Sequence, residues 1–181
     1  MCRGLFASMV VFVVLAAGCA SVTRDITVET EVDPKADLTG YQSYTWAGAA
    51  ALVNDPRSSW SPPGFDVGEE IRFLVDRELH NRGMKQNSVN PDMVVAFAVG
   101  VDMTALKWVK DTKLKTLNLQ NVPQGALTLI FADAATDRVI SIGSATADLQ
   151  SSPNDEVVRK RLDYAVTRMV KEMVRKSRQG E

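Results

Sequence analysis

The chain has 181 residues, of which 45% are hydrophobic and 24% are charged, and its formal net charge is −1. This length suits one domain with a real core, and the near-neutral charge gives no global case for nucleic-acid binding. The single histidine, His80, excludes a His-rich metal site, and it excludes a His-dependent catalytic triad unless His80 itself supplies the base.

The N-terminal segment has the order of parts found in a secretory signal. Arg3 is the one charge before residue 19, and a mostly apolar run extends from Leu5 to Leu15. That run is too short for a comfortable membrane span, which needs about 20 residues. It ends in Leu15-Ala16-Ala17-Gly18-Cys19, which resembles the lipobox of a bacterial lipoprotein signal peptide.

The resemblance implies cleavage before Cys19 and attachment of acyl chains, palmitate among them, to this cysteine. We therefore expect a signal peptide over residues 1–18, a lipidated N-terminus and tether over 19–24, and a single periplasmic domain over 25–178. Ala20 follows the cysteine where an Asp would commonly signal inner-membrane retention, so we expect the periplasmic face of the outer membrane. The alternative is an ordinary secretory signal followed by a coincidental cysteine.

Two strands are predicted at the start of the domain. Residues 25–33 alternate between apolar or Thr side chains and acidic or polar ones, which predicts a half-buried strand with an acidic outer face. A second strand is predicted over 41–46, with Tyr44 and Trp46 on one side. The Gly and Pro residues of 47–65 predict a long loop, and loops of this length are often functional.

A helix is predicted to begin at Asp66, which forms a capping box with Glu69, and Gly83 is its expected C-terminal cap. The run over 93–101 is apolar on both faces and predicts a central strand. Its large side chains alternate with Val94, Ala96, Ala98 and Gly100, so the helices are expected on the large face.

The rest of the chain predicts a hairpin and a second helix. Residues 104–123 read as an irregular strand or an exposed loop. Strands over 126–132 and 138–149 flank a turn at 133–137. Ser152-Pro153 is the expected start of a terminal helix. The sequence thus predicts an α+β fold: a two-layer domain with a mainly antiparallel sheet of about five strands and two helices packed on one face.

Three blocks of this pattern resemble a lipoprotein family catalogued as domain of unknown function 4136. They are 41–46 (YQSYTW), the helix end at Leu79 and Gly83 followed by 91–95 (PDMVV), and 125–133 (GALTLIFAD) with the hairpin and terminal helix after it. Together they cover most of the expected mature chain, from Cys19 on. The resemblance implies the fold and an envelope location, and it implies no activity.

Few residues in the sequence suggest a binding, catalytic or metal site. Tyr44, Trp46 and Trp60 lie beside the Pro-rich loop and are the candidate binding surface. The alternative is that these aromatic residues belong to the core or anchor the loop. His80 is expected on the helix surface, and Asp133 and Asp137 are expected to serve the turn and not a cation. We predict no catalytic residue, no metal and no cofactor.

These observations favour a non-enzymatic envelope lipoprotein with a protein-binding, structural or assembly role. Its expected partners are the membrane, through the acyl chains on Cys19, and an envelope protein, with no nucleic acid. One alternative is a module that binds a small ligand or a cell-wall polymer on the sheet face of Val94, Ala96 and Ala98, together with Tyr44 and Trp46. A more remote alternative is a hydrolase that uses two carboxylates. The basic residues of the terminal helix predict a solvated face or contact with anionic headgroups or cell-wall polymer.

Overall fold

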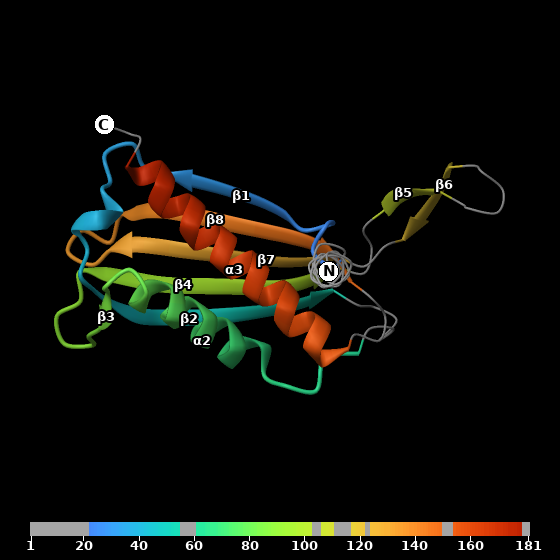
Figure 1. Cartoon of the computed structure of the whole chain (residues 1–181), viewed down its shortest axis with the longest axis horizontal. Helices are drawn as coiled ribbons and strands as arrows, with labels where there is room; N and C mark the ends of the chain where they lie inside the picture. Colours follow the sequence, from blue (N-terminus) through green and yellow to red (C-terminus); the bar gives the residue numbers. More distant parts are fainter. Residues whose placement is uncertain are drawn as a thin grey trace, which may run out of the picture.

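The structure is a computed structural model that describes residues 22–54, 61–102, 106–110, 117–121, 124–149 and 154–178. It has two layers, a sheet and a pair of helices that lie on one face of it (Figure 1). Within the described residues, no helix is both long and apolar enough to span a membrane. The predicted α+β class is confirmed, with the order β1, β2, α2, β4, β7, β8 and α3 for the main elements.

The main sheet has six strands in the order β1-β8-β7-β4-β2-β3. Its strands are β1 (Thr27–Val32), β2 (Ser43–Asn54), β3 (Lys85–Gln86), β4 (Met93–Asp102), β7 (Gln124–Asp133) and β8 (Val139–Asp148). Pairing is antiparallel except for β2, which lies parallel to both β3 and β4. The sixth strand, beyond the five expected, is the two-residue β3 at the sheet edge.

The strand β2 is longer than the sequence predicts. It continues to Asn54, so the first part of the expected loop over 47–65 is strand. The register with β4 shifts between Trp46 and Gly48, which indicates a bulge at Ala47. Pairing with the central strand overrides the weak strand preference of the Ala- and Gly-rich segment.

Residues 104–123 contain a second, two-stranded sheet. The strands β5 (Leu106–Lys110) and β6 (Leu117–Asn121) are antiparallel, with Trp108 opposite Leu119. This hairpin lies past one end of the main sheet (Figure 1). The expectation of an irregular strand or loop is therefore replaced by two regular strands.

The first helix, α2 (Val67–His80), has the predicted ends. The Asp66 side chain accepts a hydrogen bond from the Glu69 N–H at 3.0 Å. At the other end Gly83 has φ of 85°, and the N–H of Met84 donates to the Leu79 carbonyl at 3.1 Å. Gly83 donates to His80 at 2.9 Å, so the helix closes in a Schellman motif.

The second helix, α3 (Asp155–Ser177), begins later than expected. Its N-cap is Asn154, whose side chain accepts from the Glu156 and Val157 N–H groups, so the predicted start at Ser152-Pro153 is wrong. An Asx side chain that reaches the N2 and N3 amides is a strong helix start, and it fixes the boundary here. Asp155 and Glu156 lie at the positive end of the helix dipole, as expected.

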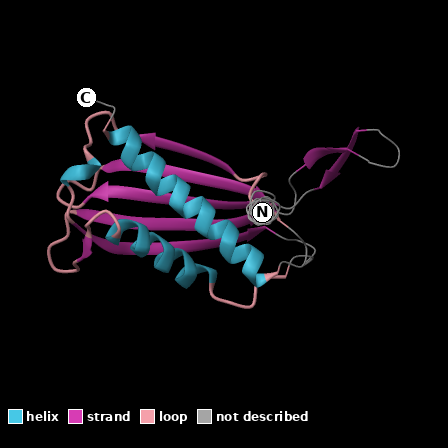
Figure 2. Cartoon of the chain, viewed as in Figure 1, coloured by secondary structure: helices cyan, strands magenta, loops and turns pink. Residues whose placement is uncertain are grey.

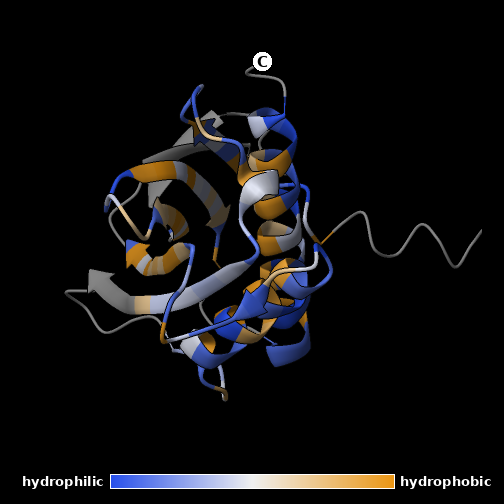
Figure 3. Ribbon diagram, turned by 90° about the vertical axis from the view of Figure 1, so that its left-hand side faces the viewer, coloured by the Kyte–Doolittle hydropathy of each residue, from blue (hydrophilic) through white to orange (hydrophobic). Residues whose placement is uncertain are grey.

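The core lies between the helices and one face of the sheet (Figure 2). The large side chains of β4 face the helices, as predicted: Met93, Val95 and Phe97 are all buried. On β8, Gly143 lets α3 come close, because a Cβ there would lie 3.0 Å from the Met173 sulfur. Seen from the end of the sheet, both helices lie on one side of the curved strands (Figure 3).

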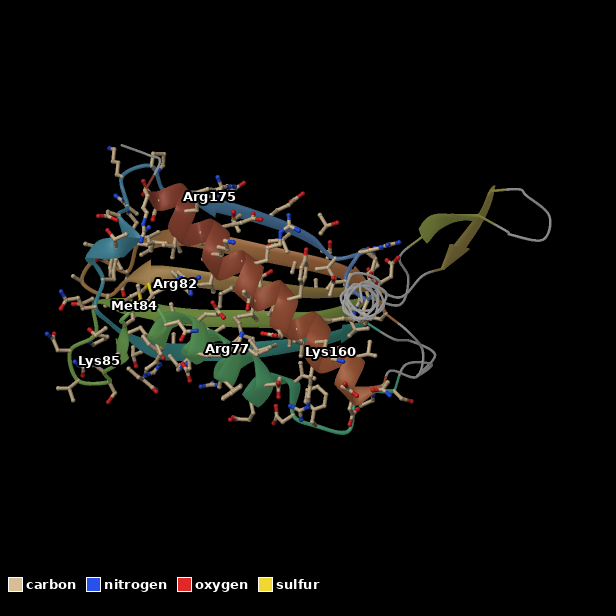
Figure 4. All side chains as sticks on the ribbon, in the orientation of Figure 1. Arg77, Arg82, Met84, Lys85, Lys160 and Arg175 are labelled. Carbon is tan, nitrogen blue, oxygen red and sulfur yellow. The ribbon has the colours of Figure 1, made fainter. Side chains whose placement is uncertain are left out.

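A buried carboxylate joins the two helices. Glu78 of α2 is 7% exposed and accepts hydrogen bonds from Arg77, Arg82 and Thr167, the last of these on α3. Burial alone would raise the pKa of Glu78, but these three donors outweigh it and hold the pKa below its ordinary value. Arg77 also bonds to Asp163, so it spans the gap between the helices (Figure 4).

Candidate functional site

The described chain begins at Val22, and its first residues are held against α3. Arg161 donates to both carboxylate oxygens of Asp25, at 2.8 and 2.6 Å. The same guanidinium bonds to the Val22 carbonyl and to the Asp148 carbonyl, the latter at 3.0 Å. We call this arrangement of Val22, Asp25, Asp148 and Arg161 the N-terminal clamp.

The local sequence explains how the clamp forms. Residues 22–25 make a turn before β1, which places the Asp25 side chain beside the end of β8. There the Asp148 N–H donates to the carboxylate of Asp25 at 2.9 Å. The hydrogen bonds from Arg161 are the main reason that the pKa of Asp25 lies below its ordinary value. Asp25 is therefore a fixed negative charge at neutral pH.

An apolar cavity lies next to the clamp, between α3 and the sheet. Its volume is about 130 Å³, and its lining is almost wholly aliphatic. We call it the α3 cavity; Arg161 stands at its edge, and among the side chains that line it are Ile26, Val99, Leu127, Ala147, Leu162 and Ala165. An apolar space of this size can take up a small hydrophobic group.

The outer side of α3 carries several of the basic residues of this helix, among them Lys160, Arg168, Lys171 and Arg175. Lys160 pairs with Glu156 at 2.7 Å and Arg168 with Glu172 at 2.9 Å, both one helical turn apart. A shallow hollow on this side runs along the helix from Lys160 to Arg175, which lie toward its two ends (Figure 4). Ion pairs between residues i and i+4 are typical of a helix face that is exposed to solvent.

The predicted aromatic surface lies elsewhere, at the contact between β2 and α2. Tyr44 is fully buried, and its hydroxyl donates to Asp76 Oδ1 at 2.7 Å. Trp46 is half-buried, and its Nε1 donates to the same oxygen at 3.0 Å. Burial, followed by the bond to Asp76, raises the pKa of the Tyr44 hydroxyl. Tyr44 is thus part of the core, and Trp60 lies outside the described residues.

The structure contradicts one way of combining these residues into a binding site. Tyr44 pairs with Met93 and Trp46 with Val95, so both aromatic side chains lie on the helix face of the sheet. Ala96 and Ala98 alternate with those positions and point to the opposite face. A single site made of the small-residue face together with Tyr44 and Trp46 is therefore wrong, because the sheet separates the two sets.

The other candidates have structural contacts. The His80 ring is exposed, and its Nδ1 lies 2.9 Å from the Asp76 carbonyl, to which it donates. Asp133 accepts from the Thr136 N–H at 2.8 Å and from the Tyr41 hydroxyl at 2.9 Å. Asp137 takes φ of 55° in the same turn. Across the segments that the structure describes, no group of three or more His, Cys, Asp or Glu side chains is arranged to hold a metal ion.

The clamp and the cavity were not found from the sequence. In the sequence, Arg161 is one of many basic residues on the predicted terminal helix. Asp25 is the first residue of a predicted alternating strand. The two are 136 positions apart, and no local pattern links them.

The fold defines the class of this protein, which is a two-layer α+β domain. The profile of the family described as "Domain of unknown function (DUF4136)" matches residues 28–172. The chain therefore belongs to that family.

Solved structures show the same fold. A DUF4136 family protein from Bacteroides thetaiotaomicron VPI-5482 aligns with 82% of this chain and 95% of its own, at 10% identity and a TM-score of 0.53. A PDZ domain protein from Parabacteroides distasonis ATCC 8503 aligns with 86% of this chain at 12% identity and a TM-score of 0.50. The match spans 38% of that longer protein. No curated protein matches the sequence.

Removing the clamp is expected to loosen the N-terminal residues. An Arg161→Met chain loses the charged hydrogen bonds to Asp25, and we expect a fall of about 1–2 kcal/mol in the free energy of unfolding at pH 7. The folded pKa of Asp25 lies below its ordinary 3.8. This stabilisation is therefore complete above that pH and is lost as the pH falls through the lower folded value.

Urea denaturation of the purified chain at pH 7 and at lower pH measures both effects. Arg168→Met is the control, because Arg168 is more exposed and pairs with Glu172 on the same helix. Its effect is expected to stay below about 0.5 kcal/mol. Equal losses in the two variants, or a loss for Arg161→Met that persists unchanged in acid, would contradict the role given to the clamp.

Proposed function

We propose that this protein is a lipid-anchored, non-enzymatic lipoprotein of the cell envelope, held by acyl chains on Cys19 at the periplasmic face of the outer membrane. The observation that carries the proposal is the run Leu15-Ala16-Ala17-Gly18-Cys19, followed within three residues by the clamped Val22. A chain anchored at Cys19 would thus pass almost directly into the folded domain. Ala20, in place of an Asp, supports the outer membrane over the inner one.

The domain itself is proposed to bind another envelope protein. Two acid–base side chains weighed from the sequence, His80 and Asp133, make hydrogen bonds within the fold, and this supports a non-enzymatic role. On the open face of the sheet, Ile142 is 37% exposed, and Val94, Ala96 and Ala98 are half-buried without a helix of the described chain over them (Figure 2). A contiguous apolar area on one face of a sheet is a feature of protein contact sites, whereas a single exposed apolar side chain is not.

Location is tested by separating inner and outer membranes on a density gradient and by adding protease to spheroplasts. We expect the chain in the outer-membrane fractions, and we expect protease to reach it only after the outer membrane is opened. An Ala20→Asp chain should move to the inner-membrane fractions. Recovery of the unchanged chain from the inner membrane would contradict the sorting proposed here.

Partner binding is tested in cells with a photo-crosslinking residue at Ile142 and, as control, at Phe73, which is 62% exposed on α2. A discrete crosslinked envelope protein from Ile142, absent from Phe73, supports the proposal. Turnover of a substrate by the purified chain, abolished by a single substitution, would overturn its non-enzymatic part.

A further inference from the structure

We propose that the α3 cavity holds a segment of an acyl chain carried by Cys19. This inference rests on the proposed lipidation of that cysteine and deepens it, because it gives the domain a binding site for its own lipid. Both the chemistry of the cavity and its position favour this occupant.

The chemistry of the cavity matches an alkyl chain. Its walls are formed by aliphatic side chains such as Val99, Leu127 and Leu162, and no aromatic ring is among them. The one charged residue in the lining is Arg161, whose guanidinium is already engaged by Asp25, Asp148 and Val22. An anionic headgroup could bind Arg161 only by displacing these hydrogen-bond partners. Uncharged methylenes make no hydrogen bonds, so they can enter the cavity without breaking any of these contacts.

The size of the cavity limits what it can take. At about 130 Å³ it is slightly smaller than the engineered apolar cavity of about 150 Å³ that binds benzene. A few methylenes of one chain would fill it, and the remainder of the lipid would stay outside. The occupant is therefore a segment of a chain and not a whole lipid.

The position of the cavity singles out the lipid on Cys19. Arg161 lines the cavity and also bonds to the Val22 carbonyl, and Ile26 at the start of β1 lines it as well. Cys19 precedes Val22 by three residues, so the two Cα atoms are at most about 11 Å apart. A long acyl chain on Cys19 therefore begins close to the side of the cavity that Arg161 and Ile26 line.

The test uses the full chain in growing cells fed with palmitic acid that carries a diazirine near its methyl end. After illumination, mass spectrometry measures the intact N-terminal peptide and any lipid adduct on the α3 peptide that contains Val158 and Leu162. The expected result is an acylated Cys19 and an adduct on this peptide, with the adduct lost in Cys19→Ala. Acylation without any adduct would overturn the inference and leave the proposed function standing.

Two further outcomes are distinguishable. An adduct that persists in Cys19→Ala would identify the occupant as a phospholipid chain and overturn the assignment to Cys19. A chain without acylation would overturn the proposed function and this inference together. Either result is read from the same two peptides.

Cavity-filling variants provide the matched comparison. Ala147→Leu narrows the cavity, and Leu162→Phe does so from the helix side. The adduct is expected to fall by about tenfold in each, the change expected when about two methylenes lose their buried site. Ala135→Leu adds the same bulk as Ala147→Leu in the exposed turn after β7, at the opposite end of that strand from the cavity, and should leave the adduct unchanged. Urea denaturation midpoints show whether each variant is folded. An undiminished adduct in both Ala147→Leu and Leu162→Phe would overturn the inference.

Discussion

A Phe131→Ala chain is expected to lose about 3–5 kcal/mol of its free energy of unfolding, enough to unfold much of a marginally stable domain. Phe131 lies on the helix face of β7 and is 1% exposed. It pairs in register with Val95 of the central strand, which is also fully buried. Its removal would leave a cavity in the layer between sheet and helices, where neighbouring side chains can relax only in part.

Urea denaturation measures this loss, and Phe73→Ala is the matched control. Phe73 has the same side chain but is 62% exposed on α2, so its truncation is expected to cost less than about 0.5 kcal/mol. Similar midpoints for the two variants would contradict the placement of the core between β7 and the helices.

An Asp76→Ala chain is expected to lose about 2–4 kcal/mol, because two buried or half-buried donors then have no acceptor. Tyr44 Oη and Trp46 Nε1 both donate to Asp76 Oδ1, at 2.7 and 3.0 Å. Asp76→Asn keeps an oxygen at this place and should retain most of the stability.

A second substitution tests the mechanism of that loss. In the Asp76→Ala background, Tyr44→Phe removes the unsatisfied hydroxyl and is expected to restore part of the stability, although Tyr44→Phe alone destabilises the protein. The four chains form a double-mutant cycle in urea. If Asp76→Asn is as harmful as Asp76→Ala, or if Tyr44→Phe restores nothing, the shared carboxylate is not what holds β2 to α2.

The elements that could be predicted are those with strong local signals. The alternation of side chains before Pro34 predicts β1. The caps at Asp66 and Gly83 predict the two ends of α2. The alternation of large and small side chains over 93–101 predicts β4 and the face of β4 that packs against the helices. In each case the determinant lies within a few residues of the element that it fixes.

The remaining features depend on contacts between distant segments. Nothing local in the Ala-rich part of β2 favours a strand, and its pairing with β4 decides the outcome. Asn154, two positions after the predicted start, caps α3 through its own side chain. Asp25 and Arg161 meet only because β1 and α3 lie side by side in the fold.

The candidate site also combines a feature that depends on local sequence with features that depend on contacts between distant segments. The proposed processing and lipidation at Cys19 depend on a pattern of five neighbouring residues, Leu15 to Cys19, which a sequence alone can carry. The clamp at Val22 and the cavity behind it cannot be read from the sequence, because both arise from the packing of α3 on three strands. Tyr44 was the misleading candidate: an aromatic residue beside a Pro-rich loop has the same sequence pattern whether it lines a groove or, as here, fills the core.

The most direct test is the intact mass of the processed chain, compared with Cys19→Ala, together with the membrane fractionation of both. The account predicts a chain that begins at Cys19, carries acyl chains on that residue and stays with the membrane. It also predicts that Cys19→Ala lacks the acyl mass and the membrane retention that depends on it. A chain that is cleaved elsewhere, carries no lipid and is recovered in solution with Cys19 intact would contradict the account.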